Sequence, residues 1–222
     1  ESGIPDFRST GGLYSQTYKY PPEMIVSHTF YEECPEEFFD FYKKRMLFMN
    51  AQPNAAHKKL AQLEKAGKLK AVITQNIDGL HQAAGSKNVL ELHGSVLRNY
   101  CESCGKSFPV KYVLEADGVP HCDACGGRVK PDVVLYEENL DMDVMEAAVN
   151  YISRADMLII GGTSLVVYPA AGLLRYYQGH KLVLVNKSNT SYDSRADLVI
   201  NENIGEVFSQ IQGPYLDKAA SE

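Results

Sequence analysis

The fold is decided by one apolar run and the polar residues directly after it, Lys70-Ala71-Val72-Ile73-Thr74-Gln75 and then Asn76-Ile77-Asp78-Gly79-Leu80-His81. The run is almost continuously apolar rather than alternating, as in strands that are buried on both faces of a sheet. Polar side chains that follow such a strand lie at the carboxyl edge of the sheet, where α/β proteins bind their ligands. The stretch therefore predicts a buried parallel strand that ends in a ligand-binding turn.

Further apolar runs of the same kind extend this prediction along the chain, at residues 89–93, 156–161, 181–186 and 197–200. Helical stretches separate several of them, as in βαβ units. We expect helices at residues 36–49, 54–67, 143–153, 169–177 and 204–211, with Asn54 as an N-cap and Gly67 as a stop. The pattern predicts an α/β fold built on a doubly wound, Rossmann-like parallel sheet.

Two stretches interrupt the α/β pattern. Residues 14–51 contain aromatic residues, prolines and one helical segment, and residues 100–130 contain most of the cysteines. We expect them to form a smaller second lobe, made of a helical insertion and a metal-binding ribbon. Residues 1–13, 52–99 and 131–222 then form the Rossmann-like domain.

The composition is that of a globular protein: the 222 residues are 45% hydrophobic and 23% charged, with a net charge of -6. No basic excess points to nucleic acid. Residues 157–174 carry no charge, but their glycines, proline and hydroxyl residues favour a strand, a turn and a helix start over a membrane span. No signal peptide is visible, and we expect a cytoplasmic protein.

Four of the five cysteines form two CxxC pairs, which are Cys101 with Cys104 and Cys122 with Cys125. Each pair can place two thiolates on one turn, and two such turns complete a tetrahedron around Zn²⁺. Four thiolates leave no open position for water, so the pattern predicts a structural zinc in a reducing compartment. The alternatives are a redox dithiol, idle thiols, or His121 as a substitute ligand. Cys34 has no assigned role.

Four motifs follow one another along the chain: Glu1-Ser2-Gly3-Ile4-Pro5-Asp6-Phe7-Arg8, Thr74-Gln75-Asn76-Ile77-Asp78-Gly79-Leu80-His81, Leu92-His93-Gly94 and Gly162-Thr163-Ser164-Leu165. With the cysteine pairs placed just after the His-Gly pair, the chain resembles the sirtuin family over essentially its whole length. The resemblance implies NAD-dependent deacetylation of acetyl-lysine in proteins or peptides, with release of nicotinamide and O-acetyl-ADP-ribose. It implies a structural Zn²⁺ and neither nucleic-acid nor membrane partners.

The resemblance also implies roles for individual residues. His93 matches the general base, and Asn76 and Asp78 match residues that position the nicotinamide end of NAD. Further NAD contacts correspond to Phe7, Arg8, Gln75, Ile77, Gly162, Thr163, Ser164, Asn186, Lys187 and Ile204. The acyl-lysine would lie against Val134 and Tyr136, and the peptide backbone would be clamped between residues 134–137 and Leu165, Val166 and Val167.

Each of these residues also has a simpler interpretation. A Gly-Gly turn after a strand is usually only a turn, and an isolated histidine such as His93 is more often a hydrogen-bonded structural residue. Gln75, Asn76 and Asp78 alone could be turn formers. Their common position at one sheet edge favours function.

The chain departs from the family pattern at three places. The family's first strand and its Gly-Ala-Gly-x-Ser loop are absent before Glu1, so we expect an N-terminally truncated, short bacterial-type member with weakened turnover. The family's Phe-Gly-Glu reads Tyr136-Glu137-Glu138. Tyr42 and Arg45 form a Tyr-x-x-Arg, which reads the acyl carboxylate in the subgroup that removes succinyl and malonyl groups. The alternatives are therefore a desuccinylase or demalonylase, a mono-ADP-ribosyltransferase, or a non-enzymatic zinc-ribbon binding module.

Overall fold

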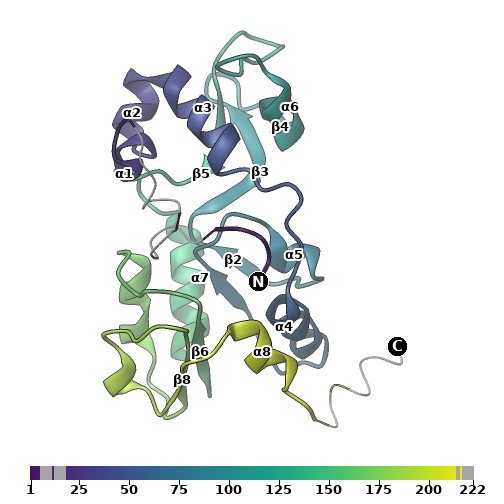
Figure 1. Cartoon of the computed structure of the whole chain (residues 1–222), viewed down its shortest axis with the longest axis vertical. Coiled ribbons are helices and arrows are strands. Elements are labelled where there is room, and N and C mark those ends of the chain that lie inside the picture. The colour runs from purple at the N-terminus through teal and green to yellow at the C-terminus, as the bar shows by residue number, and fades with distance from the viewer. Residues whose placement is uncertain (6–11, 13–18, 214–215, 217–222) are drawn as a thin grey trace.

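The computed structural model describes residues 1–5, 12, 19–213 and 216, and the chain forms two lobes that lie one above the other in Figure 1. The N-terminus lies near the level where the lobes meet. Phe7 and Arg8, both expected to contact NAD, fall outside the described residues.

The upper lobe packs helices against an antiparallel sheet. Its helices are α1 (Pro22–Ile25), α2 (His28–Glu33), α3 (Pro35–Arg45) and α6 (Val110–Glu115). The sheet has the order β4-β3-β5, with β3 (Gly94–Cys101) pairing antiparallel to β4 (Ser107–Pro109) and β5 (Val129–Val133). α3 ends at Arg45, four residues before the expected end at residue 49.

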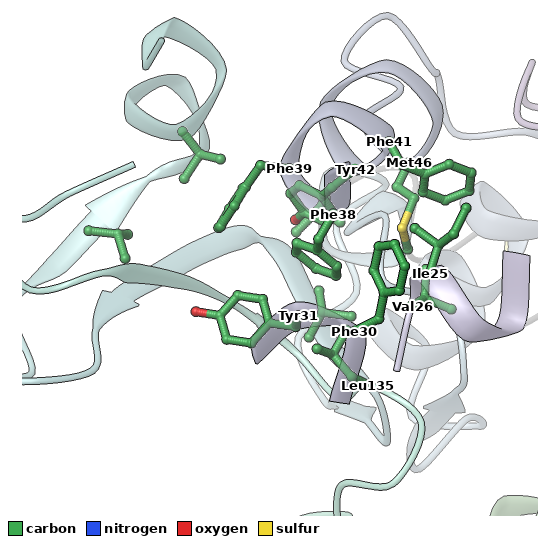
Figure 2. Packing of buried hydrophobic residues seen from close by; sticks show 14 of the residues in the cluster. Ile25, Val26, Phe30, Tyr31, Phe38, Phe39, Phe41, Tyr42, Met46 and Leu135 are labelled. Carbon is green, nitrogen blue, oxygen red and sulfur yellow. The ribbon is translucent and has the colours of Figure 1, made fainter. Parts of the chain in front are cut away.

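Aromatic residues of α2 and α3 form the core of this lobe, as Figure 2 shows. Phe38 and Tyr42 lie stacked one turn apart on α3, with ring centroids 5.8 Å apart, and Tyr31 of α2 meets Phe38 edge to face at 5.0 Å. Such aromatic pairs stabilise a core beyond the area that they bury. The helical insertion and the cysteine ribbon therefore share one core.

The lower lobe contains the predicted parallel strands. β1 (Val72–Thr74) pairs with β2 (Val89–Glu91), and β7 (Leu182–Val185) pairs with β6 (Leu158–Gly161) and β8 (Leu198–Ile200). The helices of this lobe are α4 (Ala55–Lys65), α5 (Leu80–Ala83), α7 (Met142–Ser153) and α8 (Ile204–Ser209). Two 3-10 helices are η2 (Ala170–Tyr176) and η3 (Asp193–Arg195). Parallel pairing throughout confirms the α/β class expected from the apolar runs.

The parallel strands do not form the single sheet that the apolar runs suggest. Within the described residues the ladder is split into a β1-β2 sheet and a β6-β7-β8 sheet, so β1 and β6 are both edge strands. The side chains of Gln75 and Thr163 nevertheless bridge the ends of the two edge strands, with Nε2 of Gln75 donating to Oγ1 of Thr163 at 3.4 Å. Ile73 of β1 and Leu158 of β6 also pack against one cluster that contains Ala148 and Ile152 of α7.

Local signals set most helix ends. Asn54 is the N-cap of α4, because its Oδ1 accepts hydrogen bonds from the backbone N–H groups of Ala56 at 2.9 Å and His57 at 3.2 Å. The stretch at 169–177 was expected to be α-helical and is instead the 3-10 helix η2. Gly172 within it lowers α-helix propensity, and short helical segments often adopt the tighter 3-10 form.

We propose that residues 1–13, 52–99 and 131–222 make up the NAD-binding domain and that 14–51 and 100–130 are its insertions, with β3 and β5 running across the junctions between them. Among the described residues, every helix is too short or too polar to cross a membrane.

Candidate active site

A cavity of about 2270 Å³ is lined by residues of both lobes, among them Val26 and Met46 from the upper lobe and Gln75 and Ile160 from the lower one. Small-molecule sites usually measure roughly 300–1,000 Å³, so this space exceeds what one ligand needs. Part of the excess runs along the two unpaired edges, because β1 and β6 both contribute lining residues.

The turn after β1 is held by its own side chains. The N–H of Asn76 donates to Oγ1 of Thr74 at 3.0 Å, and Oδ1 of Asp78 accepts the N–H of Leu80 at 2.9 Å, at the start of α5. Gly79 between them has a φ of 73°, which favours glycine. Asp78 therefore shapes the turn, and Asn76 and Asp78 also line the cavity.

His93 lies directly after β2 and is oriented by the backbone of this same turn. Its Nδ1 lies 3.1 Å from the carbonyl oxygen of Gln75. A carbonyl oxygen can only accept, so Nδ1 carries the proton and Nε2 keeps its lone pair. Burial lowers the pKa of His93 from its ordinary value, against an opposing effect of the Gln75 carbonyl. The imidazole is therefore neutral near pH 7 and able to accept a proton at Nε2.

The glycine turn after β6 forms another wall of the cavity. Gly161 packs against Ile204 at the start of α8, and Gly162 has a φ of 61°. Oγ1 of Thr163 accepts the N–H of Leu165 at 3.2 Å as well as the amide of Gln75. A glycine turn of this kind lets backbone approach a ribose or phosphate closely.

The residues expected on the adenosine side follow β7. Asn186 is fixed at the strand end, because its N–H donates to the carbonyl of Ile200 at 3.1 Å and its Nδ2 to the carbonyl of Ser188 at 2.7 Å. Lys187 beside it is exposed. The cavity brings together all of the described cofactor-site residues that were predicted: Gln75, Asn76, Ile77, Asp78, His93, Gly162, Thr163, Ser164, Asn186, Lys187 and Ile204.

Most of the predicted peptide-binding residues line the same cavity, namely Val134, Tyr136, Leu165, Val166 and Val167. The N–H of Val134 donates to the carbonyl of His93 at 3.1 Å, so the segment after β5 starts beside the histidine. Val166 is 57% exposed, as befits a residue whose partner is a ligand rather than the core. Geometry therefore joins the proposed peptide clamp to the proposed catalytic base.

The structure does not bring Tyr42 and Arg45 to this site. Tyr42 is 1% exposed and belongs to the aromatic core of the upper lobe, where it stacks on Phe38 (Figure 2). Arg45 lies exposed near the end of α3, and neither residue lines the cavity. The spacing does place the two residues on one helix, but packing turned that helix face to the core around Tyr42.

The four paired cysteines converge at the upper end of the molecule. Their Sγ atoms all lie within 4.8 Å of one another, with 3.4 Å between Cys101 and Cys125 and 3.6 Å between Cys104 and Cys122. Thiolates on a tetrahedral zinc lie roughly 3.8 Å apart, given a Zn–S distance of about 2.3 Å. The donor set thus fits a structural zinc, while Nδ1 of His121 contacts the carbonyl of Gly126 instead.

Sequence reasoning assigned no site role to two buried histidines near the turn. His57 and His81 line the cavity with their ring centroids 4.6 Å apart, and Asp78 lies close enough to raise the pKa of His57 against the larger effect of burial. Burial lowers the pKa of His81 to about 4. His57 follows the N-cap Asn54 in sequence, but only the packing of α4 on α5 pairs it with His81.

Comparisons with known proteins agree with the motifs and the geometry. The family model described as "Sir2 family" matches residues 1–169. The chain is 60% identical to an NAD-dependent protein deacetylase of Clostridium acetobutylicum, over 95% of this chain and 87% of that protein. It is 46% identical to one of Staphylococcus aureus strain Mu50, over 95% of this chain and 87% of that protein.

Solved structures are similar at the level of the whole fold. A Sir2 with p53 peptide and NAD⁺ is 41% identical with a TM-score of 0.83, over 100% of this chain and 89% of that one. A Sir2 with deacetylated p53 peptide and 3'-O-acetyl ADP-ribose is 44% identical with a TM-score of 0.86, over 93% of this chain and 85% of that one. The chain belongs to the Sir2 family.

Proposed function

We propose that this chain removes acetyl groups from lysine side chains of proteins in an NAD-dependent reaction, with His93, Asn76 and Asp78 as its catalytic residues. The observation that carries the assignment of the base is the contact between Nδ1 of His93 and the carbonyl of Gln75, which leaves Nε2 free to accept a proton. Imidazole suits proton transfer near neutral pH, and burial keeps this one in its basic form.

The remaining cavity residues suit the two substrates. NAD is a co-substrate that would lie along the carboxyl edge of the strands, with its nicotinamide end near Asn76 and Asp78 and its adenosine end near Asn186 and Lys187. The acetyl-lysine would enter beside Val134 and Tyr136, so that its amide oxygen attacks the ribose carbon as nicotinamide leaves. His93 would then take the proton from a ribose hydroxyl.

The zinc has a structural role in this proposal. Bound by Cys101, Cys104, Cys122 and Cys125, it supplies a cross-link within the ribbon and no chemistry at His93. Four reduced thiolates require a reducing environment, and for that reason we place the protein in the cytoplasm.

The test is release of nicotinamide from NAD in the presence of acetyl-, succinyl- and unmodified peptides. Deacetylation gives one nicotinamide per acetyl group lost, with O-acetyl-ADP-ribose as the nucleotide product. Mass spectrometry of the peptide distinguishes the alternatives: a gain of ADP-ribose indicates a transferase, and peptide binding without nicotinamide release indicates a binding module. Loss of the succinyl group in preference to acetyl indicates a desuccinylase.

A further inference from the structure

Glu137 lies in an unusual backbone conformation next to the proposed peptide clamp. Its φ is 75°, in the left-handed region that favours glycine, and glycine is what the family pattern has at this position. Among the described residues, Leu165 with a φ of 56° is the other non-glycine residue in this region, and it belongs to the opposite side of the clamp. Backbone strain persists only where the surroundings hold it, and it gathers at binding sites.

The side chain of Glu137 supplies what holds this conformation. Its Oε2 accepts the N–H of Thr29 at 2.9 Å and the Oγ1–H of Thr29 at 2.7 Å. Thr29 lies in the first turn of α2, where backbone N–H groups lack a partner within the helix and favour a negative charge. Glu137 thus ties the clamp to a helix of the upper lobe.

The neighbouring carboxylate makes a parallel connection. Oε1 of Glu138 lies 3.0 Å from Nδ1 of His28, and its Oε2 accepts the N–H of Leu135 at 2.8 Å and an N–H of the buried Lys130 at 3.2 Å. Two successive acidic residues therefore contact two successive residues at the start of α2. The position of the segment is fixed by side chains from both lobes.

The main chain around Glu137 is otherwise committed. The N–H of Tyr136 donates to the carbonyl of Val26 at 3.0 Å, and its carbonyl accepts the N–H of His28 at 2.9 Å. The N–H of Glu138 donates to the carbonyl of Leu135 at 3.1 Å. Within the part of the chain that the structure describes, the N–H and C=O of Glu137 itself make no main-chain hydrogen bond. They are the groups left to pair with an added strand.

The geometry points to Glu137 as a positioning residue for peptide binding: its carboxylate, locked on Thr29, holds the unpaired main-chain N–H and C=O of residue 137 in place for the substrate backbone. This inference rests on the proposed function, since it assigns a task to the same cleft. A glycine could adopt the same φ without strain, but it could not hold the segment against α2. The lock therefore sets peptide affinity and leaves the chemistry at His93 unchanged.

The experiment measures the Kd of an acetyl-lysine peptide by fluorescence anisotropy, together with kcat, for wild type, Glu137→Gly, Thr29→Val and the double variant. Glu137→Gly relieves the backbone strain, so its melting temperature reports whether the fold is kept. We expect its peptide Kd to rise about tenfold, the loss typical of hydrogen bonds to a charged group, with kcat and the Kd for NAD unchanged.

Thr29→Val removes only the hydroxyl donor, and we expect it to raise the peptide Kd about threefold in the wild type and not at all in Glu137→Gly. Glu146→Gln, on the exposed face of α7, removes the same charge elsewhere and serves as the matched control. An unchanged peptide Kd in Glu137→Gly, or an equal effect of Thr29→Val in both backgrounds, overturns the inference. A wild type that neither binds nor deacetylates the peptide refutes the proposed function instead.

Discussion

Nδ1 of His93 lies 3.1 Å from the carbonyl oxygen of Gln75, so the residue after β1 determines which nitrogen of the histidine can act as a base. The two residues lie on successive parallel strands, and their backbones are also joined by the N–H of Leu92, which donates to the carbonyl of Thr74 at 2.9 Å. The tautomer of the proposed base is therefore a property of the sheet edge.

Replacement of this histidine tests its role directly. We expect His93→Ala to lower kcat about 10²–10⁴-fold, the usual contribution of a general base. The melting temperature should stay close to that of the wild type, because the ring is only half-buried and bonded to one carbonyl. Wild-type turnover at saturating NAD would falsify the assignment.

The buried histidines predict a dependence of stability on pH. Burial lowers the pKa values of His57, His81 and His93, that of His81 to about 4. Between the folded and the unfolded pKa values the unfolded chain binds more protons, so the free energy of unfolding falls as pH drops from about 6.5 towards 4. Urea denaturation at pH 7.5, 6 and 5 measures this effect.

A variant separates this effect from that of other groups. His81→Leu removes one of these titrations and should flatten the pH dependence in this range. The carboxylates of Glu137 and Glu138, whose pKa values are lowered mainly by hydrogen bonds, contribute only nearer and below pH 4.5. Equal stability at pH 7.5 and 5 would contradict the burial of neutral histidines.

Removal of zinc should loosen the upper lobe. Structural zinc contributes on the order of 10–16 kcal/mol to the folding of its module. We expect freshly purified reduced protein to carry one zinc, and chelation or Cys101→Ser to lower the melting temperature and reduce activity indirectly. Cys34→Ser is the control, because Cys34 is not part of the thiol cluster. Purified protein that lacks zinc would show that the thiols are idle or redox-active.

Acyl selectivity should not depend on Arg45. Because Tyr42 is packed in the core and Arg45 does not line the cavity, Arg45→Met should change the ratio of succinyl to acetyl turnover by less than about twofold, as is usual for surface changes. Parallel kinetics with acetyl- and succinyl-peptides give this ratio. A selective collapse of succinyl turnover in the variant would restore the carboxylate-reading hypothesis.

The unpaired edges of β1 and β6 predict that an added strand stabilises the lower lobe. Both strands border the large cavity, where their N–H and C=O groups lack a ladder partner within the described residues. An N-terminal extension with the family's first strand and Gly-Ala-Gly-x-Ser loop should raise the melting temperature and tighten NAD binding. A Gly/Ser extension of equal length is the control. Equal melting temperature and NAD affinity in both extended chains would show that the edges accept no strand.

The sequence by itself determined the elements and the chemistry that they carry. The apolar runs gave the strands β1, β2, β6, β7 and β8, because a strand buried on both faces needs a continuous apolar composition. Asn54 identified the start of α4, and the spacing of the CxxC pairs identified the thiol cluster, because caps and chelating turns are local in sequence.

Only the tertiary structure decided how these parts face one another. The Tyr-x-x-Arg spacing is compatible with a surface or a core position, and it is the packing against Phe38 and Phe39 that buried Tyr42. The bond from His93 to Gln75 and the lock between Thr29 and Glu137 join residues far apart in sequence. No local pattern encodes such contacts, since they form only when separate elements pack and each polar group finds its nearest partner.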